Sequence, residues 1–137
     1  MLRRMQPSQK PVSRYMSAAP VAIQQTASMA DAIALMQEHD VRHLPVLDDR
    51  MPVGIVSERD LAMARSLVPV GWEEIPVAEA MTPEPYTVAP DTPLAIVARR
   101  MADQRYGAAL VADAAGQLLG VFTTTDALVA LAACGDG

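Results

Sequence analysis

Apolar residues that follow Ser28 recur at the spacing of a helix. Met29, Ile33 and Met36 fall on one helical face. Ser28, directly before them, is a residue type that caps helix N-termini. The helical pattern stops near Asp40. We therefore predict a helix that begins after Ser28 and ends close to that aspartate.

Two short apolar runs follow this helix and flank a polar turn. Runs of this length that are separated by a tight turn predict two strands of a hairpin. A second helix is expected to follow Ser57 and to end near Arg65, and a short extended piece is expected before the first helix. In chain order, the predicted elements are 20–23, 29–40, 44–47, 53–56 and 57–65.

The second half of the chain repeats this order of elements. When the sequence is slid along itself, identical residues align in one register, and the register moves by one residue after the first hairpin turn. One short copy alone would bury little apolar surface, so we expect both copies to form one α/β (α+β) fold. The second set of predicted elements is 86–88, 91–104, 108–111, 118–122 and 123–132. Aligned pairs include Met16 and Met81, Pro20 and Pro85, Met36 and Met101, Val46 and Val111, Gly54 and Gly120, and Asp60 and Asp126.

The composition limits the classes of function. The chain has 137 residues, of which 51% are apolar and only 4% aromatic, so its core must be aliphatic. This length suits one compact domain and is too short for two independent domains of typical size. The formal charge of -5 disfavours sequence-independent binding of nucleic acid, because that affinity comes from many basic residues that neutralise phosphates. We expect no nucleic-acid partner.

The chain carries no evident signal for export or for a membrane. Residues 1–11 begin with a basic pair, but polar residues follow where a signal peptide has its apolar region, so we expect a disordered arm. The longest apolar stretch, 127–134, is too short to cross a membrane. A single cysteine, Cys134, excludes an intrachain disulfide, and this favours a cytoplasmic protein.

A segment rich in proline and glycine separates the two copies. It contains Trp72, which we expect to pack against the module or a partner. The expected boundaries are a disordered N-terminal arm at 1–11, a first repeat at 12–66, a linker at 67–76, a second repeat at 77–133 and a tail at 134–137.

Each copy carries the motif Gly-x-x-(Ser/Thr)-x-x-Asp where its last strand becomes its last helix. The first backbone N–H groups of a helix have no partner within the helix, so such a junction attracts an anion. The hydroxyl can donate to that anion, and the carboxylate could accept both hydroxyls of a ribose. The glycine would let a ligand approach the backbone closely. These residues are Gly54, Ser57 and Asp60 in the first copy, and Gly120, Thr123 and Asp126 in the second.

The same residues also match a simpler structure. Ser/Thr-x-x-Asp is close to a capping box, in which the hydroxyl and the carboxylate satisfy the helix's own free N–H groups. From one copy alone, capping would be the better interpretation. Repetition of the motif after a glycine in the same strand favours a ligand site.

The ordered set of features resembles the CBS domain family, whose tandem pairs form regulatory modules often called Bateman modules. The resemblance covers about residues 12 to 133 and rests on Met16 with Pro20, the strand entry 42–46, the two motifs and the repeat. It implies two βαββα repeats that pack through their sheets about a pseudo-twofold axis. Between the repeats it implies two clefts that can hold adenosine-containing ligands.

In that family the strand after the first helix supplies further ligand contacts. Arg42 and His43 match this position, and a guanidinium suits phosphate oxygens. The second copy has uncharged Gly107 and Ala108 here, so we expect unequal clefts, of which the one at Asp126 is the better candidate. The implied nucleotide-binding residues are Ile23, Arg42, His43, Pro45, Gly54, Ser57, Arg59, Asp60, Thr87, Val88, Ala108, Gly120, Thr123, Thr125 and Asp126.

The resemblance also implies a homodimer. The apolar faces of the second helix of each copy are candidates for burial against a second module. The candidate residues are Leu61, Met63, Leu128, Val129 and Leu131.

Other chemistry in the sequence is weaker. His39 and His43 have the spacing of two metal ligands on a helix, but the helix is expected to break at Asp40, so we predict no metal site. No nucleophile–base pair or acidic metal cluster indicates an enzyme.

The sequence therefore predicts a regulatory module that requires no cofactor and acts on an unknown regulated protein. Its expected ligand is AMP, ADP or ATP, with S-adenosylmethionine or NADH as further possibilities. The alternative is a ligand-free dimerisation and protein-interaction module, in which the Ser/Thr-x-x-Asp turns are only helix caps.

Overall fold

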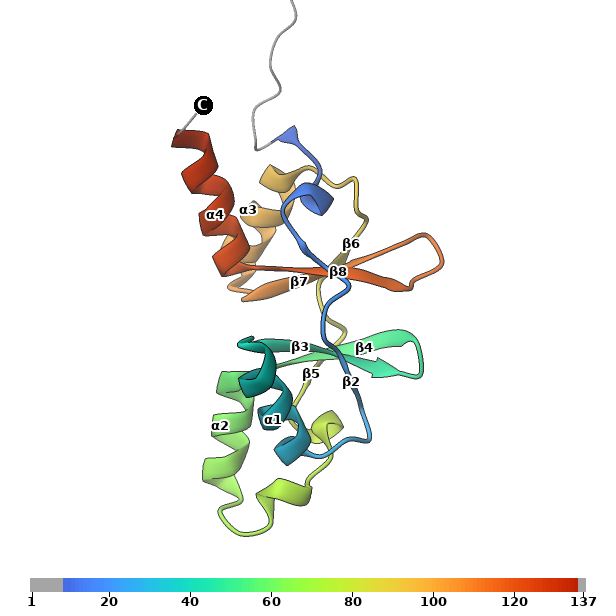
Figure 1. Cartoon of the computed structure of the whole chain (residues 1–137), viewed down its shortest axis with the longest axis vertical. Helices are drawn as coiled ribbons and strands as arrows, with labels where there is room; N and C mark the ends of the chain where they lie inside the picture. The colour runs from blue at the N-terminus through green and yellow to red at the C-terminus, as the bar shows by residue number, and fades with distance from the viewer. Residues whose placement is uncertain (1–8, 136–137) are drawn as a thin grey trace, which may run out of the picture. The chain divides into compact units, whose positions relative to one another are not determined.

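The computed structural model describes the backbone of residues 9–135 and confirms a mixed α/β fold (Figure 1). The described residues form four α-helices, several short 3-10 helices and two four-stranded sheets. The chain divides into two compact units. One is Pro20–Pro85, and the other is built from the described residues on either side of that segment.

The Pro20–Pro85 unit contains a sheet in the strand order β2-β3-β4-β5. Strands β3 and β4 are antiparallel, β2 runs parallel to β3, and β5 runs antiparallel to β4. Both α-helices of the unit lie on one face of this sheet (Figure 1). Its elements are β2 (Ile23–Gln24), α1 (Met29–His39), β3 (His43–Asp48), β4 (Met51–Ser57), α2 (Glu58–Leu67), η3 (Trp72–Glu74), η4 (Val77–Glu79) and β5 (Thr82–Pro83).

The other unit repeats this arrangement, with the strand order β1-β8-β7-β6. Strands β7 and β8 are antiparallel, β6 runs parallel to β7, and β1 runs antiparallel to β8. Its elements are η2 (Val12–Arg14), β1 (Ser17–Ala18), β6 (Thr87–Val88), α3 (Leu94–Gln104), β7 (Ala108–Ala112), β8 (Leu118–Thr123) and α4 (Thr124–Gly135).

The two-residue strands β1 and β5 are exchanged between the repeats. Strand β1 precedes the first repeat's own strands but pairs with β8. Strand β5 follows the first repeat but pairs with β4. The compact units therefore divide the chain at different positions from the sequence repeats. Two-residue strands are too short to leave an alternating pattern, so the sequence could not reveal this exchange.

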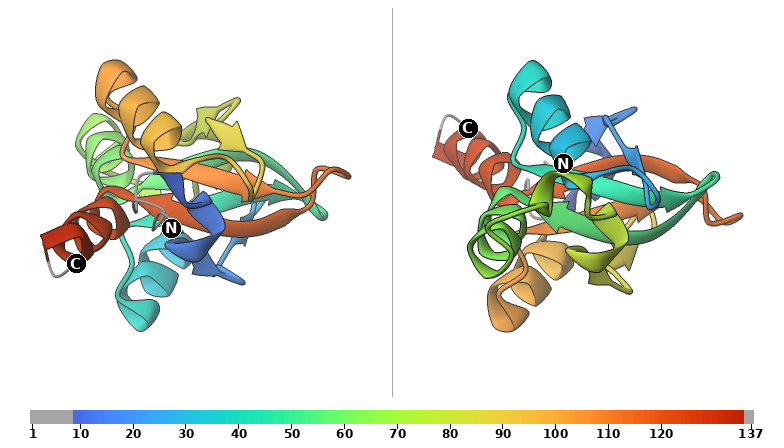
Figure 2. Two further views of the ribbon diagram at one scale, coloured as in Figure 1. Left: turned by 90° about the horizontal axis from the view of Figure 1, so that it is seen from above. Right: turned by 90° about the horizontal axis from the view of Figure 1, so that it is seen from below.

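Each hairpin turn lies far from the start of the helix that follows it. Figure 2 shows the β3–β4 turn at the end of its sheet that is remote from α2, and the β7–β8 turn remote from α4. The junctions between β4 and α2 and between β8 and α4 therefore lie at the end of each sheet that is opposite its hairpin turn. Both Gly-x-x-(Ser/Thr)-x-x-Asp motifs lie at these junctions.

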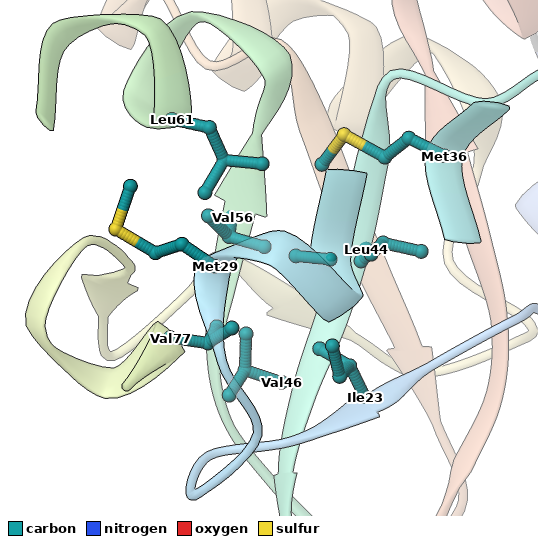
Figure 3. Close-up of a cluster of buried hydrophobic side chains, with 9 residues drawn as sticks. Ile23, Met29, Met36, Leu44, Val46, Val56, Leu61 and Val77 are labelled. Atoms are coloured by element: carbon teal, nitrogen blue, oxygen red, sulfur yellow. The ribbon is translucent and has the colours of Figure 1, made fainter. Parts of the chain in front are cut away.

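An aliphatic core lies between the sheet of the Pro20–Pro85 unit and its helices (Figure 3). Trp72 packs against this core, and the Arg65 guanidinium lies 4.9 Å from the centre of its ring. Leu61 is only 2% exposed and belongs to the core, so the expectation that it contributes to a dimer face is wrong. The core consists of Ile23, Met29, Ala32, Met36, Leu44, Val46, Val56, Leu61 and Val77.

Helix α3 begins at Leu94, three residues later than the sequence predicted from Asp91. Pro93 occupies the N-cap position and makes no side-chain cap. The residues before it form a turn, because the Thr92 N–H donates to the carbonyl of Ala89 over 3.1 Å. The Thr92 carbonyl is also used, since it accepts the N–H of Val12.

Some of the predicted arm and tail is part of the fold. The Leu94 N–H donates to the Lys10 carbonyl over 2.9 Å, and Pro11 forms an isolated bridge with Pro93. The end of the expected disordered arm is therefore held against the start of α3. Residues 1–8 of that arm lie outside the described residues, and α4 continues to Gly135 within the segment expected as a tail.

Candidate functional site

A capping box forms where β4 becomes α2. The Ser57 N–H donates to Oδ2 of Asp60 over 2.9 Å, and the Asp60 N–H donates to the Ser57 hydroxyl over 3.0 Å. Both side chains are half-buried. The reciprocal pair satisfies two N–H groups at the helix start.

The corresponding box at the start of α4 contains one further contact. The Thr123 N–H donates to Oδ2 of Asp126 over 2.9 Å, and the Asp126 N–H approaches the Thr123 hydroxyl at 3.4 Å. In addition, the Thr123 hydroxyl donates to Oδ2 of Asp126 over 3.2 Å. This third contact aligns the hydroxyl with the carboxylate.

A third capping box opens α1, outside the two motifs. The Asp31 N–H donates to the Ser28 hydroxyl over 3.1 Å, and the Ser28 N–H approaches Oδ2 of Asp31 at 3.4 Å. Capping geometry alone therefore does not distinguish the two motifs from an ordinary helix start. The boxes at α2 and α4 engage only Oδ2 of each aspartate, so Oδ1 is not used by the cap.

Strand pairing determines which predicted residues share a face with these caps. His43 lies opposite Ser57, and Ala108 lies opposite Thr123. Side chains alternate along a strand, so Pro45 shares the face of His43. In the same way Thr87, opposite Leu110, shares the face of Ala108. In each unit this face is the one opposite the buried core residues of the same strands.

Other predicted residues lie on the helix-facing side. Ile23 is 6% exposed and belongs to the core, and Val88 packs against the core of its own unit. Arg42 lines a groove between α1 and α2. Arg42 and His43 are adjacent in sequence, yet they lie toward different surfaces, and the predicted basic pair is divided.

Close packing explains why both motifs begin with glycine. A Cβ atom on Gly54 would lie 2.9 Å from the carbonyl oxygen of Thr82 and would overlap the sulfur of Met81. Gly120 has the same relation to the carbonyl of Ser17 and the sulfur of Met16. Strands β5 and β1 thus require glycine at these positions, whatever a ligand requires.

The remaining predicted residues lie in the first turns of the helices. Arg59 in α2 and Thr125 in α4 are exposed.

The imidazole of His43 in β3 is half-buried. Burial lowers its pKa below the ordinary 6.5, while the charge of Asp60 opposes this shift. Burial therefore favours the neutral imidazole, in which one ring nitrogen is a donor and the other an acceptor.

Two kinds of site are absent from the described part of the chain. Among residues 9–135, no helix is both long and apolar enough to span a bilayer. Within the same residues, no cluster of three or more His, Cys, Asp or Glu side chains could hold a metal ion. His39 approaches Glu38 at 4.0 Å, and His43 faces the α2 cap instead.

The groove lined by Arg42 is not marked by any sequence motif. It lies wholly within the Pro20–Pro85 unit. Residues at helical spacing in the two predicted helices were the signal in the sequence, but nothing there indicated that the two helices pack side by side.

Comparisons with known proteins place these features in a family context. The family model described as CBS domain matches residues 12–67 and 77–133. The structure of CBSX2 from Arabidopsis thaliana in complex with AMP is 28% identical, with 90% of this chain and 97% of that chain covered and a TM-score of 0.79.

Two other relatives are at least as similar in sequence. An uncharacterized conserved protein from Pyrococcus horikoshii has 34% identity, covers 90% of this chain and 93% of its own, and has a TM-score of 0.79. Inosine-5'-monophosphate dehydrogenase of Korarchaeum cryptofilum is 32% identical over 72% of this chain. The match spans only 20% of that enzyme's length.

Proposed function

The chain belongs to the CBS domain family, and we propose that it is a regulatory module that binds an adenine nucleotide or a related adenosyl ligand. The observation that carries the proposal is the pair of glycine-preceded caps, in which a hydroxyl and a carboxylate are already held together at a helix N-terminus. The related CBSX2 structure contains AMP, which supports an adenine nucleotide as the ligand class.

In the proposed complex, different groups at the start of α4 contact the phosphate and the ribose of the ligand. The positive end of the α4 helix dipole and the exposed hydroxyl of Thr125 would attract a phosphate. Oδ1 of Asp126, which the cap does not use, would accept ribose hydroxyls. We assign the better site to Thr123–Asp126, because Glu58 places a negative charge in the first turn of α2.

The proposed mode of regulation requires no catalysis. A ligand changes a conformational or assembly equilibrium only through different affinities for the two states. AMP, ADP, ATP, S-adenosylmethionine and NADH are the ligands to compare. The regulated protein is a separate partner whose state follows the bound ligand.

The proposed assembly is a homodimer formed through exposed apolar side chains. Met63 on α2 is 61% exposed, and α4 exposes three further apolar residues. Large apolar side chains gathered on a helix face favour burial against another surface. The three residues of α4 are Leu128, Val129 and Leu131. Sedimentation of Leu128→Glu beside Ala102→Glu, an exposed control on α3, tests this assembly: the first is expected to be monomeric and the second dimeric.

Thermal unfolding tests the ligand proposal. At millimolar concentration, at least one of the five ligands is expected to raise the unfolding temperature of the parent, because a ligand that binds only the folded state stabilises it. Asp126→Ala is expected to lose most of that increase. If none of the five ligands shifts the transition of the parent protein, the sensor function is wrong.

One observation favours the alternative of a ligand-free interaction module. The box at Ser28 and Asp31 has the same connectivity as the motif boxes without belonging to a motif. If the motifs are only caps, Asp126→Ala lowers stability modestly and changes no binding. The stability loss is expected under both functions, so the effect of ligands on the unfolding temperature separates them.

A further inference from the structure

A groove with a cavity volume of about 480 Å³ lies between α1 and α2. Helices α1 and α2 lie side by side (Figure 1). Each helix lines the groove with residues at helical spacing, which places them on one face of the helix. They are Ile33, Met36 and Gln37 on α1, with its C-cap Asp40, and Glu58, Leu61, Ala62 and Arg65 on α2.

The middle of the groove is apolar. Met36 and Leu61 form a floor that is continuous with the core, with exposed fractions of 5% and 2%. Ile33 and Val41 add further apolar surface. Five of the ten lining residues are apolar and five are polar, so the groove suits a ligand that has both kinds of surface.

The end of the groove where α2 begins carries mixed charge. The Glu58 N–H donates to the Arg42 carbonyl over 2.9 Å, so the start of α2 is fixed against the segment that follows α1. Asp40 and Glu58 bring two carboxylates to this end beside the single guanidinium of Arg42. An anionic group is disfavoured there.

The opposite end carries Arg65 alone. Arg65 makes no ion pair with any residue that the structure describes, and its guanidinium lies over the ring of Trp72 at 4.9 Å. A guanidinium stacked on an aromatic face keeps its N–H edge for hydrogen bonds, and the stacking limits its rotamers. Arg65 is therefore a preordered anion contact at one end of a groove whose floor is apolar.

We propose that this groove binds an amphipathic anion, a small molecule with an apolar body and one carboxylate or similar group. The apolar body lies along Ile33, Met36 and Leu61, and the anionic group pairs with Arg65. The two carboxylates at the far end determine the orientation, because they repel the anionic group.

The groove is separate from the surfaces used in the proposed function. The groove-lining residues of α2 include Leu61 and Arg65. Met63 lies on the opposite side of the helix, because successive residues of an α-helix are turned by about 100°. The caps at Ser57 and Thr123 use the other face of their strands. Binding in the groove does not depend on whether the chain binds a nucleotide.

Titration with octanoate tests the proposal, with octanol as the uncharged analogue. Calorimetry is expected to show saturable binding of octanoate at one site per chain and at least about tenfold weaker binding of octanol, since a charge-assisted pair is lost. The emission of Trp72, the one tryptophan in the chain, is expected to change with the same midpoint, because Arg65 stacks on its ring.

Matched variants locate the site. Arg65→Gln is expected to weaken octanoate binding at least about tenfold, whereas Arg99→Gln, an exposed arginine on α3, leaves it unchanged. Ala62→Phe fills the groove and is expected to abolish binding, whereas Ala34→Phe on the exposed side of α1 does not. Unfolding curves check that each variant is folded.

Three results would overturn the proposal. The first is the absence of saturable octanoate binding by the parent, the second is equal affinity for octanol, and the third is unchanged binding by folded Arg65→Gln. If the parent binds no octanoate and Ala62→Phe changes the sedimentation coefficient, a second copy of the chain occupies the groove instead. Asp126→Ala is expected to bind octanoate with the same affinity as the parent, because Asp126 does not line the groove, so failure here is distinct from failure of the nucleotide proposal.

Discussion

The Thr123 hydroxyl donates a hydrogen bond to the Asp126 carboxylate over 3.2 Å, in addition to the two contacts of the capping box. In the described first turn of α2, the cap of Ser57 and Asp60 consists of the two backbone contacts alone. The two motifs therefore differ in how firmly they position the hydroxyl, and the α4 motif is the more preordered.

The three capping boxes predict comparable costs for the removal of their carboxylates. Asp31→Ala and Asp60→Ala each delete one hydrogen bond to the carboxylate, and Asp126→Ala also deletes the one from the Thr123 hydroxyl. Each substitution is expected to lower the free energy of unfolding by about 1 to 2 kcal/mol. Urea unfolding without ligand measures these costs. A loss well above about 2 kcal/mol for Asp126→Ala alone would mean that its carboxylate has a structural role beyond the cap.

The packing of Gly54 predicts a large effect of one methyl group. Gly54→Ala forces the new Cβ against the Thr82 carbonyl and the Met81 sulfur, and is expected to cost about 1 to 3 kcal/mol of stability. In the background of Met81→Ala, part of this cost is expected to disappear, because the flexible side chain is gone and only the backbone contact remains.

A double-mutant cycle of these two substitutions measures their coupling free energy. Gly71→Ala is not a suitable comparison for Gly54→Ala. Its cost would come from the positive φ of 87° at Gly71 and not from packing, because no atom lies within 4 Å of the added Cβ. Additive effects of Gly54→Ala and Met81→Ala would contradict the proposed contact.

The environment of His43 predicts a lowered pKa for its imidazole. The pKa of His43 is expected below 6.5, because burial disfavours its charged form more than the carboxylate of Asp60 favours it. Asp60→Asn is expected to lower the pKa further, whereas Asp31→Asn, in the cap of another helix, leaves it unchanged. NMR titration of the imidazole protons measures both, and an increase in the pKa on Asp60→Asn would contradict this arrangement.

The lowered pKa of His43 also predicts how stability depends on pH. Below pH 6.5 the unfolded chain binds a proton at this residue that the folded chain does not, so this contribution to stability is lost as the pH falls through 6.5 toward the folded value. His43→Gln is expected to show a smaller loss of unfolding free energy between pH 7 and about pH 5 than the parent. Identical pH profiles for the two proteins would contradict the assignment.

The repeat and its elements could be predicted because they depend on local patterns. The helical spacing after Ser28 and the apolar runs on either side of Asp49 are strong local signals, and α1 and the β3–β4 hairpin formed where they indicated. The start of α3 was misplaced, because Asp91 resembles an N-cap residue, whereas Pro93 fixes the backbone before Leu94.

The candidate site was only partly predictable. The motifs located Ser57, Asp60, Thr123 and Asp126, because helix starts depend on residues three apart. The division of Arg42 from His43 depends on strand alternation and on how α1 packs beside α2, and neither is readable from adjacent residues. The packing reason for Gly54 required strand β5, whose two residues leave no pattern.

Calorimetric titration with AMP of the parent, Asp126→Ala and Asp31→Ala tests the proposed ligand site most directly. The parent has both caps, and each variant lacks the carboxylate of a different one. We expect saturable binding of AMP by the parent and by Asp31→Ala, and at least about tenfold weaker binding by Asp126→Ala. Equal AMP affinities for Asp126→Ala and Asp31→Ala would contradict this proposal, since the carboxylate of Asp126 would then be a helix cap and nothing more.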